Sequence, residues 1–413
     1  MTSVDFPINE PSEEALSGPG RRGGTGLCLS GGGFRAALFH LGAAQRLEEF
    51  GLLGDLRTVS SVSGGSLFAA FLARALSWPR SQNVTREEWA IQVARPFQAF
   101  CTHDLRTAPM LKGLLPWNWN GPAAIERVAA LIDSRLTLGD LRTLPPRPKF
   151  VLCATDMAFG VNWVFERGRM GDYLAGYARY DQAFPLSLAA AASACFPVLF
   201  SPLHLKLAAS RFKGGRARRR PDFAQLVQGL RLTDGGNYDN LALEPVWKNH
   251  AVVLVSDGGS TFNFAADRGL ISRIPRHLSI LDDQSRSLRK RWLLAESSRG
   301  QEVSVYWSVG QHTGAYAARL PPDAPCLSEG YSAGVAERIG SIRTDLDAFS
   351  EGEAAVLQNH GYALADAAVQ SFVPGAATRA PEFRLPRPEW RDEVRVLEAL
   401  TDSHRTRLIG RSR

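Results

Sequence analysis

The sequence predicts an α/β fold in which helices flank a mostly parallel central sheet, followed by a C-terminal helical extension. Short apolar runs alternate with stretches of helical periodicity along most of the 413 residues, a pattern typical of parallel sheets covered by helices. Residues 26–76 show the order strand, glycine loop, helix, strand, tight turn and helix, which is a βαβ unit. Hydrophobic residues make up 45% of the chain, which is enough for a sizeable core.

The βαβ unit begins at "GLCLS" (26–30), an apolar run that stops at three glycines and predicts a buried strand. The stretch 34–50 carries leucines and alanines at helical spacing, and Gly51 suits the end of that helix. "LRTVSSV" (56–62) then predicts a second strand, and 64–76 predicts a second helix with one apolar face. Because a helix connects them, the two strands are expected to be parallel neighbours.

The rest of the chain continues this alternation. Further strands are expected at 149–155, 161–166, 230–234, 251–256 and 302–309. Further helices are expected at 185–195, about 275–299, twice between 332 and 372, and near 391–401. We therefore expect a flexible arm at 1–23, one domain at 24–375 and a Pro- and Arg-rich tail at 376–413. Within the domain, an insertion loop is expected near 205–225 and a helical extension from about 260.

Composition narrows the class of protein. No run of 18 apolar residues and no apolar N-terminal segment occurs, so neither a transmembrane helix nor a signal peptide is expected. The five cysteines are scattered and odd in number, which indicates buried free thiols in a reducing cytoplasm. Without a C-x-x-C pair or a histidine cluster, we predict no metal site and no cofactor. The net charge of +7 permits contact with anionic membranes or ligands without requiring it.

Two basic stretches leave alternatives open. "RFKGGRARRRP" (211–221) is either an exposed insertion loop or a patch for phospholipid headgroups or a nucleotide. "RSLRKRW" (286–292) has helical spacing, and we interpret it as the solvated face of an amphipathic helix in preference to a binding site.

The glycine loop "SGGGFRA" (30–36) connects the first strand to the N-terminus of the first helix. Its backbone amides and the helix dipole would bind an anion, either a phosphate or the oxyanion of an acyl-transfer intermediate. The run from Gly31 to Ala36 also fits the G-x-G-x-x-A pattern of dinucleotide-binding proteins. The second strand, however, ends without the carboxylate that would hold a ribose, so this interpretation is disfavoured.

The serine-rich turn "SSVSGGS" (60–66) lies between the second strand and the second helix, which is the context of a nucleophile elbow. Ser63 has Gly65 two residues later, as in G-x-S-x-G, whereas Ser61 replaces the first glycine with another small residue. The amide of Gly64 would point toward an oxyanion. On this turn alone, catalysis by Ser63 and plain capping of the helix are equally good interpretations.

A serine nucleophile needs a base, and no histidine follows a strand beside an acidic partner. Asp234 in "LTDGGNYDN" ends an apolar strand, and Gly235 and Gly236 leave room beside it. Its carboxylate is expected at the carboxyl edge of the parallel sheet, where burial would make it more basic. Asp257 in "SDGGS" has the same context, and the spacing does not decide between the two.

Together, "GGGFRA", "SVSGG" and the downstream "DGG" resemble the patatin-like phospholipases, a family similar to the core of cytosolic phospholipase A2. "ASACFPVLFSP" (192–202) and "ATDMAFGVNWVF" (154–165) are similar to further family segments. The resemblance implies a three-layer patatin-like fold and a catalytic dyad of Ser63 and Asp234. It also implies an oxyanion hole and supporting residues, which are Gly31, Gly32, Gly33 and Gly64, and Arg35, Gly65, Gly235 and Gly236.

The resemblance implies a lipid acyl hydrolase of the phospholipase A type, which cleaves phospholipid or other acyl esters through an acyl-enzyme. It implies a cytoplasmic protein with peripheral contact at the inner membrane surface, and neither DNA nor RNA is expected as a partner. Some bacterial members act in antiphage defence, so membrane degradation under a cyclic-nucleotide activator is a further hypothesis. The alternatives are another serine esterase, thioesterase or acyltransferase with the same dyad, and a non-catalytic protein that binds an anion or nucleotide at Gly31–Gly33.

Overall fold

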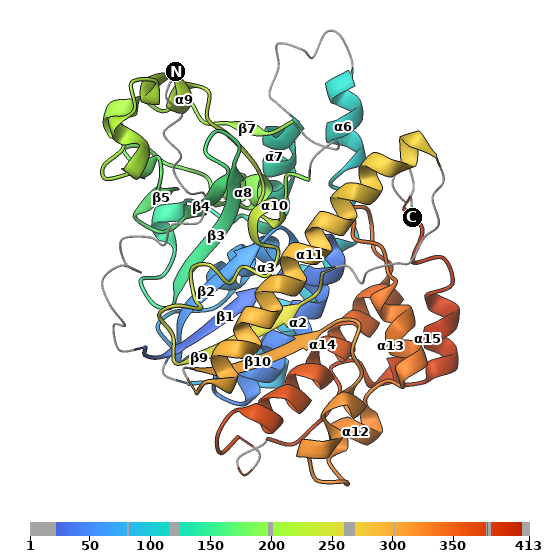
Figure 1. The fold of residues 1–413 in the computed structure, drawn as a ribbon. Helices are drawn as coiled ribbons and strands as arrows, with labels where there is room; N and C mark the ends of the chain where they lie inside the picture. The colour runs from blue at the N-terminus through green and yellow to red at the C-terminus, as the bar shows by residue number, and fades with distance from the viewer. Residues whose placement is uncertain are drawn as a thin grey trace.

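The computed structural model describes residues 22–80, 82–114, 124–196, 201–259, 269–300, 302–376, 378 and 381–406. In this part of the chain one sheet of ten strands lies between helical layers (Figure 1). The strands are β1 (Thr25–Leu29), β2 (Leu56–Val62), β3 (Lys149–Asp156), β4 (Val161–Phe165), β5 (Arg169–Asp172), β6 (Gly176–Arg179), β7 (Leu203–His204), β8 (Arg231–Asp234), β9 (Val252–Asp257) and β10 (Val303–Ser308). All predicted strands are present; β5, β6 and β7 were not predicted because they span two to four residues and contain no apolar run.

The central part of the sheet is parallel, as predicted. The strands follow in the order β10, β9, β1, β2 and β3, with every neighbouring pair parallel. Beyond β3 the sheet continues through β4, β5 and β6 as antiparallel pairs. β8 also pairs antiparallel with β3, so Asp234 lies at the expected carboxyl edge of the parallel strands, although the strand that carries it runs in the opposite direction. The reason is that Leu232 pairs with Asp156 at the end of β3, and β8 runs back from there.

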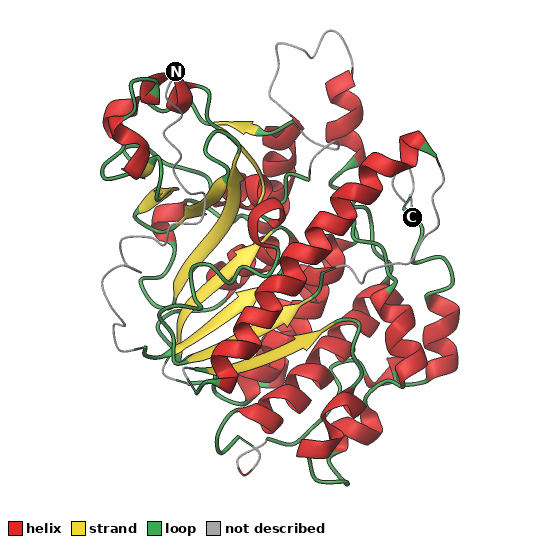
Figure 2. Ribbon diagram, viewed as in Figure 1, coloured by secondary structure: helices red, strands yellow, loops and turns green. Residues whose placement is uncertain are grey.

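Helices cover both faces of the sheet (Figure 2). On one face α2 (Gly33–Glu49) packs against α3 (Gly64–Ala75) and α14 (Glu351–Phe372), and α8 (Leu186–Ser193) packs against α3 and α7 (Ala124–Leu136). On the other face α10 (Gly236–Asp239) packs against the long α11 (Leu270–Ser298). Successive side chains of β1 point to opposite faces of the sheet. Leu27 and Leu29 therefore pack in the large core on one face, and Cys28 packs with Leu293 of α11 in the smaller core on the other.

The remaining helical elements surround this centre. They are α4 (Arg86–Trp89), the π-helical turn η1 (Ala90–Ala94), α5 (Arg95–Cys101), α6 (Thr107–Leu114), η3 (Leu141–Thr143), η4 (Ala209–Arg211), η5 (Arg216–Arg219), α9 (Phe223–Gln228), η6 (Thr313–Arg319), α12 (Pro325–Glu329), α13 (Ala333–Gly340), η8 (Pro388–Trp390) and α15 (Glu393–Ala399). All predicted helices are present. The expected arm 1–23 lies almost wholly outside the described residues. None of the described helices is both long and apolar enough to cross a membrane.

The two basic stretches differ in what they contact. In 286–292, Arg289 forms ion pairs with Asp239 and Glu244, and Arg286 forms one with Asp283. The prediction of a solvated helix face is therefore wrong for Arg289, which holds α11 against α10, whereas the Arg286–Asp283 pair lies within α11. In the insertion near 205–225, Arg218 is exposed on η5, whereas Phe212 is buried.

Candidate active site

Ser63 and Asp234 meet because β2 and β8 share one edge of β3. Val62 of β2 pairs with Cys153, and Asp234 pairs with the next residue of β3, Ala154. β2 ends where Ser63 turns the chain into α3, and β8 fills the same edge from the opposite direction. The C-terminal ends of β2 and β8 therefore meet. There, the side chain of Ser63 hydrogen-bonds to the carboxyl group of Asp234.

The backbone of Ser63 is strained. Its φ of 53° and ψ of −121° lie in a region that residues with a side chain rarely adopt. The side chain does not cap α3, although Ser63 is the first residue before that helix. The capping interpretation is therefore wrong, and the hydroxyl is directed to Asp234 instead.

The other serines of the turn support its backbone. Ser61 Oγ donates to the carbonyl oxygen of Val151 at 3.3 Å and accepts from Ser66 at 3.0 Å. Ser193, at the end of α8, accepts the N–H of Ser63 at 2.9 Å and lies 2.8 Å from the Ser66 hydroxyl. Sequence reasoning missed Ser193; the signal for it is a hydroxyl at the end of an alanine-rich apolar helix.

Asp234 is buried, and its surroundings tune its proton affinity. Burial raises the pKa of its carboxyl group to about 7, and the negative charge of Asp282 on α11 adds to the rise. Hydrogen bonds from the Gly236 N–H, at 2.7 Å, and from Ser63 act in the opposite direction. A carboxyl group with this pKa can accept a proton near neutral pH, which an ordinary surface aspartate does poorly.

The glycine loop is too crowded for side chains. A Cβ atom on Gly33 would lie 2.4 Å from the carbonyl oxygen of Asp345, and one on Gly64 would lie 2.0 Å from the carbonyl oxygen of Gly33. The φ angles of Gly32 and Gly33, 136° and 59°, also require glycine. The N-termini of α2 and α3 therefore meet beside Ser63, and both helix dipoles place partial positive charge there.

The amides of this loop differ in availability. The N–H of Gly31 donates to the carbonyl oxygen of Asn240 at 3.0 Å. This amide is therefore not free to join the oxyanion hole, and the prediction that it does so is corrected. Gly31 instead leaves space for the side chain of Ser63, because a Cβ atom on residue 31 would lie 3.1 Å from Ser63 Cβ, closer than ordinary contact. In the described part of the chain, the amides of Gly32, Gly33 and Gly64 have no hydrogen-bond acceptor.

The remaining predicted glycines keep backbone segments close together. A Cβ on Gly65 would lie 2.4 Å from the carbonyl oxygen of Leu29, and one on Gly235 would lie 2.4 Å from that of Cys153. A Cβ on Gly236 would lie 3.0 Å from Asp234 Oδ1. These positions therefore set the approach of the elbow and the base to the sheet.

Arg35 braces the glycine loop from below. Its Nε donates to the carbonyl oxygen of Gly258 at 3.1 Å, and its Nη1 donates to those of Gly340 and Ile342 at 2.9 and 2.6 Å. Burial lowers the pKa of this guanidinium to about 9. The contacts favour the bracing interpretation over a phosphate contact.

Asp257 lies elsewhere. β9, which it ends, is separated from β2 by β1. Its Oδ2 accepts a hydrogen bond from the hydroxyl of Tyr306 at 2.6 Å, and Arg286 lies 4.0 Å from its Oδ1. A residue not predicted, His40, lies under the loop with its Nε2 3.0 Å from the Ser30 carbonyl oxygen, and burial lowers its pKa to about 4. The structure therefore brings Asp234, and not Asp257, to Ser63.

Comparison with known proteins identifies one matching family. A family model described as patatin-like phospholipase matches residues 27–247, more than half of the 413 residues. No curated protein matches the sequence.

Twenty chains of solved structures match. Human GIVD cytosolic phospholipase A2 has 11% identity and a TM-score of 0.39, covering 92% of this chain and 63% of that one. Its complex with methyl gamma-linolenyl fluorophosphonate and terbium chloride has 14% identity and a TM-score of 0.45, covering 93% and 60%. VipD from Legionella pneumophila has 14% identity and a TM-score of 0.29, covering 62% and 52%. The chain thus spans less than two thirds of each of these structures.

Proposed function

The chain belongs to the patatin-like phospholipase family, a family of ester-bond hydrolases, and we propose that it is a lipid acyl hydrolase of the phospholipase A type. The observation that carries the proposal is the strained Ser63, whose hydroxyl hydrogen-bonds to a buried carboxyl group with a pKa of about 7. A serine held by a base of this strength has the properties of an activated nucleophile.

The reaction proceeds in two halves. Asp234 takes the proton of the Ser63 hydroxyl while Oγ attacks the ester carbonyl, and the amides of Gly32, Gly33 and Gly64 stabilise the oxyanion. The C–O bond of the ester then breaks, and the leaving alcohol takes the proton from Asp234. In the second half, Asp234 removes a proton from water, which attacks the acyl-enzyme. Ser63 regains its proton and the fatty acid leaves.

Hydrolysis of a fluorogenic phospholipid and of a p-nitrophenyl ester tests this proposal. Ser63→Ala and Asp234→Ala should each lower the rate by about a thousandfold or more, as removal of a nucleophile or its base does. Asp257→Ala is the matched control and should retain activity. Full activity in Asp234→Ala, combined with loss in Asp257→Ala, would overturn the assignment of the base.

Two alternatives use the same residues. A serine esterase, thioesterase or acyltransferase would share the dyad, and a panel of phospholipids, thioesters and alcohol acceptors separates these activities. A non-catalytic protein that binds an anion at the glycine loop would not react with a fluorophosphonate probe. Covalent labelling of the wild type, absent in Ser63→Ala, would therefore exclude it.

Peripheral contact with a membrane is part of the proposal. Leu281, Leu288 and Trp292 lie on one side of α11 by helical spacing, and each is at least 45% exposed. Figure 1 shows α11 crossing in front of the sheet. Leu288→Asp should lower the fraction of the protein that sediments with anionic vesicles. Leu397→Asp on α15 should leave that fraction unchanged.

Activation by a cyclic nucleotide and a role in antiphage defence are proposals that rest on the family resemblance. Addition of cyclic di- and trinucleotides to the purified protein tests the first, with hydrolysis of the fluorogenic phospholipid as readout. An unchanged rate would contradict it.

A further inference from the structure

A cavity of about 430 Å³ lies far from the glycine loop, at the other end of α2. Gln45 of α2 lines it, twelve residues along the helix from Gly33, which corresponds to about 18 Å. The other walls come from α4, η1, α5, α14 and residues 385–387 of the tail. This volume falls within the range of small-molecule sites, and π-helical turns such as η1 occur often at functional positions.

Three glutamine side chains form a ladder along one wall. Gln98 Nε2 donates to Gln358 Oε1 at 2.7 Å, and Gln358 Nε2 donates to Gln45 Oε1 at 2.9 Å. Gln45 and Gln358 are 6% and 2% exposed. The amide nitrogen of Gln45 has no acceptor among the described residues, although the residue lines the cavity. An amide donor that lines a cavity without a partner in the protein is available to an acceptor on a ligand.

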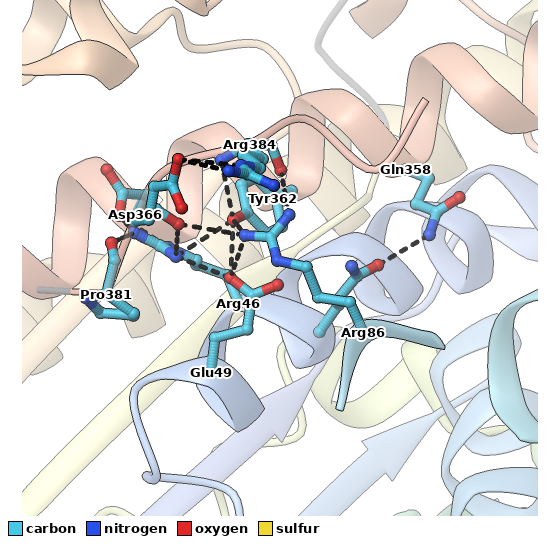
Figure 3. Close-up of polar contacts among 10 residues, drawn as sticks. Arg46, Glu49, Arg86, Gln358, Tyr362, Asp366, Pro381 and Arg384 are labelled. Carbon is cyan, nitrogen blue, oxygen red and sulfur yellow. Dashed lines mark hydrogen bonds and ion pairs between the residues drawn. The ribbon is translucent and has the colours of Figure 1, made fainter. Parts of the chain in front are cut away.

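The charged lining of the cavity is wholly basic. Its titratable side chains in the described part of the chain are Arg86, Arg95 and Arg387. Arg86 is held by Glu49 and by the hydroxyl of Tyr362, in the network that Figure 3 shows beside Gln358. Arg387 is held by Glu351 and Glu389. These contacts fix two guanidinium groups in the wall.

Arg95 differs from the other two arginines. It forms no ion pair with any described residue, and it is exposed at the start of α5. An arginine without an acidic partner, beside two further guanidinium groups, attracts an anion. A phosphate ester suits three guanidinium groups better than a carboxylate, because it offers three terminal oxygens instead of two.

We infer that this cavity binds a small organic phosphate, with the phosphate at Arg95 and the hydrogen-bonding groups of the organic part at the glutamine ladder. The chemistry is shared by free phosphomonoester metabolites and by lipid headgroups that carry a phosphomonoester, such as phosphatidic acid. Ala90, Ala94 and Leu385 provide the apolar part of the wall, against which a carbon skeleton packs. The inference does not depend on the proposed hydrolase activity.

Isothermal titration calorimetry with the full chain tests this phosphate site. The probes are AMP and sn-glycerol 3-phosphate, and the comparison compounds are inorganic phosphate and adenosine. One ester should bind more tightly than either comparison compound. Binding of an ester without binding of vesicles that contain phosphatidic acid would assign a free metabolite, and binding of those vesicles would assign a headgroup. Arg95→Ala should raise the Kd of that ester about tenfold or more, the usual effect of losing a charged hydrogen bond. Gln98→Leu should raise it as well, and the exposed Arg218→Ala on η5 should leave it unchanged.

Three outcomes would overturn the inference: no binding of either ester, equal Kd values in the wild type and Arg95→Ala, or binding of inorganic phosphate as tight as that of the esters. Thermal unfolding of each variant shows whether it is folded. Ser63→Ala should bind the ester like the wild type, so loss of hydrolysis and loss of this site are separate results.

Discussion

Asp234 must be deprotonated to act as a base, yet its position favours the protonated form. Burial raises the pKa of its carboxyl group to about 7, against the two hydrogen bonds from Gly236 and Ser63. The side chain is therefore balanced between its two states near neutral pH, and both catalysis and stability should depend on pH for the same reason.

The first prediction concerns the rate. Only the carboxylate form of Asp234 can take the proton of Ser63, so kcat/KM should rise with pH, with a midpoint near 7, and level off above it. A soluble p-nitrophenyl ester allows the measurement without a membrane. A rate that is flat from pH 5 to 8 would contradict Asp234 as the base.

The second prediction concerns stability. The pKa of Asp234 is raised in the folded state, so ionisation destabilises the fold as pH rises from the unfolded value, 3.8, to about 7. Asp234→Asn removes this cost, which is of the order of 4 kcal/mol at most. The variant should unfold at a higher temperature than the wild type at pH 8, with a smaller difference at pH 5. An equal difference at both pH values would show that ionisation of Asp234 is not the cause.

Ser193 provides the third prediction, as a positioning residue. Ser193→Ala removes the acceptor of the Ser63 N–H and the donor to the Cys153 carbonyl oxygen, at 2.9 and 2.6 Å. We expect kcat to fall about tenfold with KM nearly unchanged, and stability to fall by about 1–3 kcal/mol. Ser187→Ala, earlier in the same helix and also buried, is the matched control. An unchanged kcat in Ser193→Ala would mean that the elbow holds its shape without this contact.

At the scale of elements, the site depends on how closely α2 and α3 approach each other. Gly64→Ala would place Cβ 2.0 Å from the carbonyl oxygen of Gly33, and backbone cannot move aside as a side chain can. We expect activity to fall by about a hundredfold or more, since the oxyanion amides would separate. Gly54→Ala, whose Cβ would lie 3.6 Å from its nearest neighbour, should behave like the wild type. Circular dichroism and activity of both variants give the comparison.

Local elements of the site were predictable, and their meeting was not. The glycine loop and the elbow at Ser63 follow from short motifs between a strand and a helix. The choice between Asp234 and Asp257 depended on strand order, because β1 separates β9 from β2 whereas β8 shares the edge of β3 with β2. Strand order and the direction of β8 arise from long-range pairing, which periodicity does not encode. The amide of Gly31 was likewise misjudged, because its acceptor Asn240 is distant in the sequence.

At the scale of the whole molecule, the C-terminal segment completes the site. The carbonyl oxygens of Gly340 and Ile342 hold Arg35, and that of Asp345 accepts the Phe34 N–H at 2.9 Å. Asp345 also forms an ion pair with Arg106. The glycine loop is therefore fixed from both sides, by Gly258 directly after β9 and by residues 340–345, and both segments lie outside the family match of 27–247.

The tail in turn supports this segment, which leads to the last prediction. Trp390, Val396 and Leu400 are buried, and the Ser403 carbonyl oxygen accepts the N–H of Arg343 at 2.9 Å. Removal of residues 377–413 would delete these side chains and expose the apolar surface that they cover, at a cost of roughly 5 kcal/mol. It would also loosen 340–345, so kcat should fall even well below the unfolding temperature. Removal of 407–413 alone is the control. A chain ending at 376 that unfolds at the wild-type temperature with wild-type kcat would mean that the tail is a separate appendage.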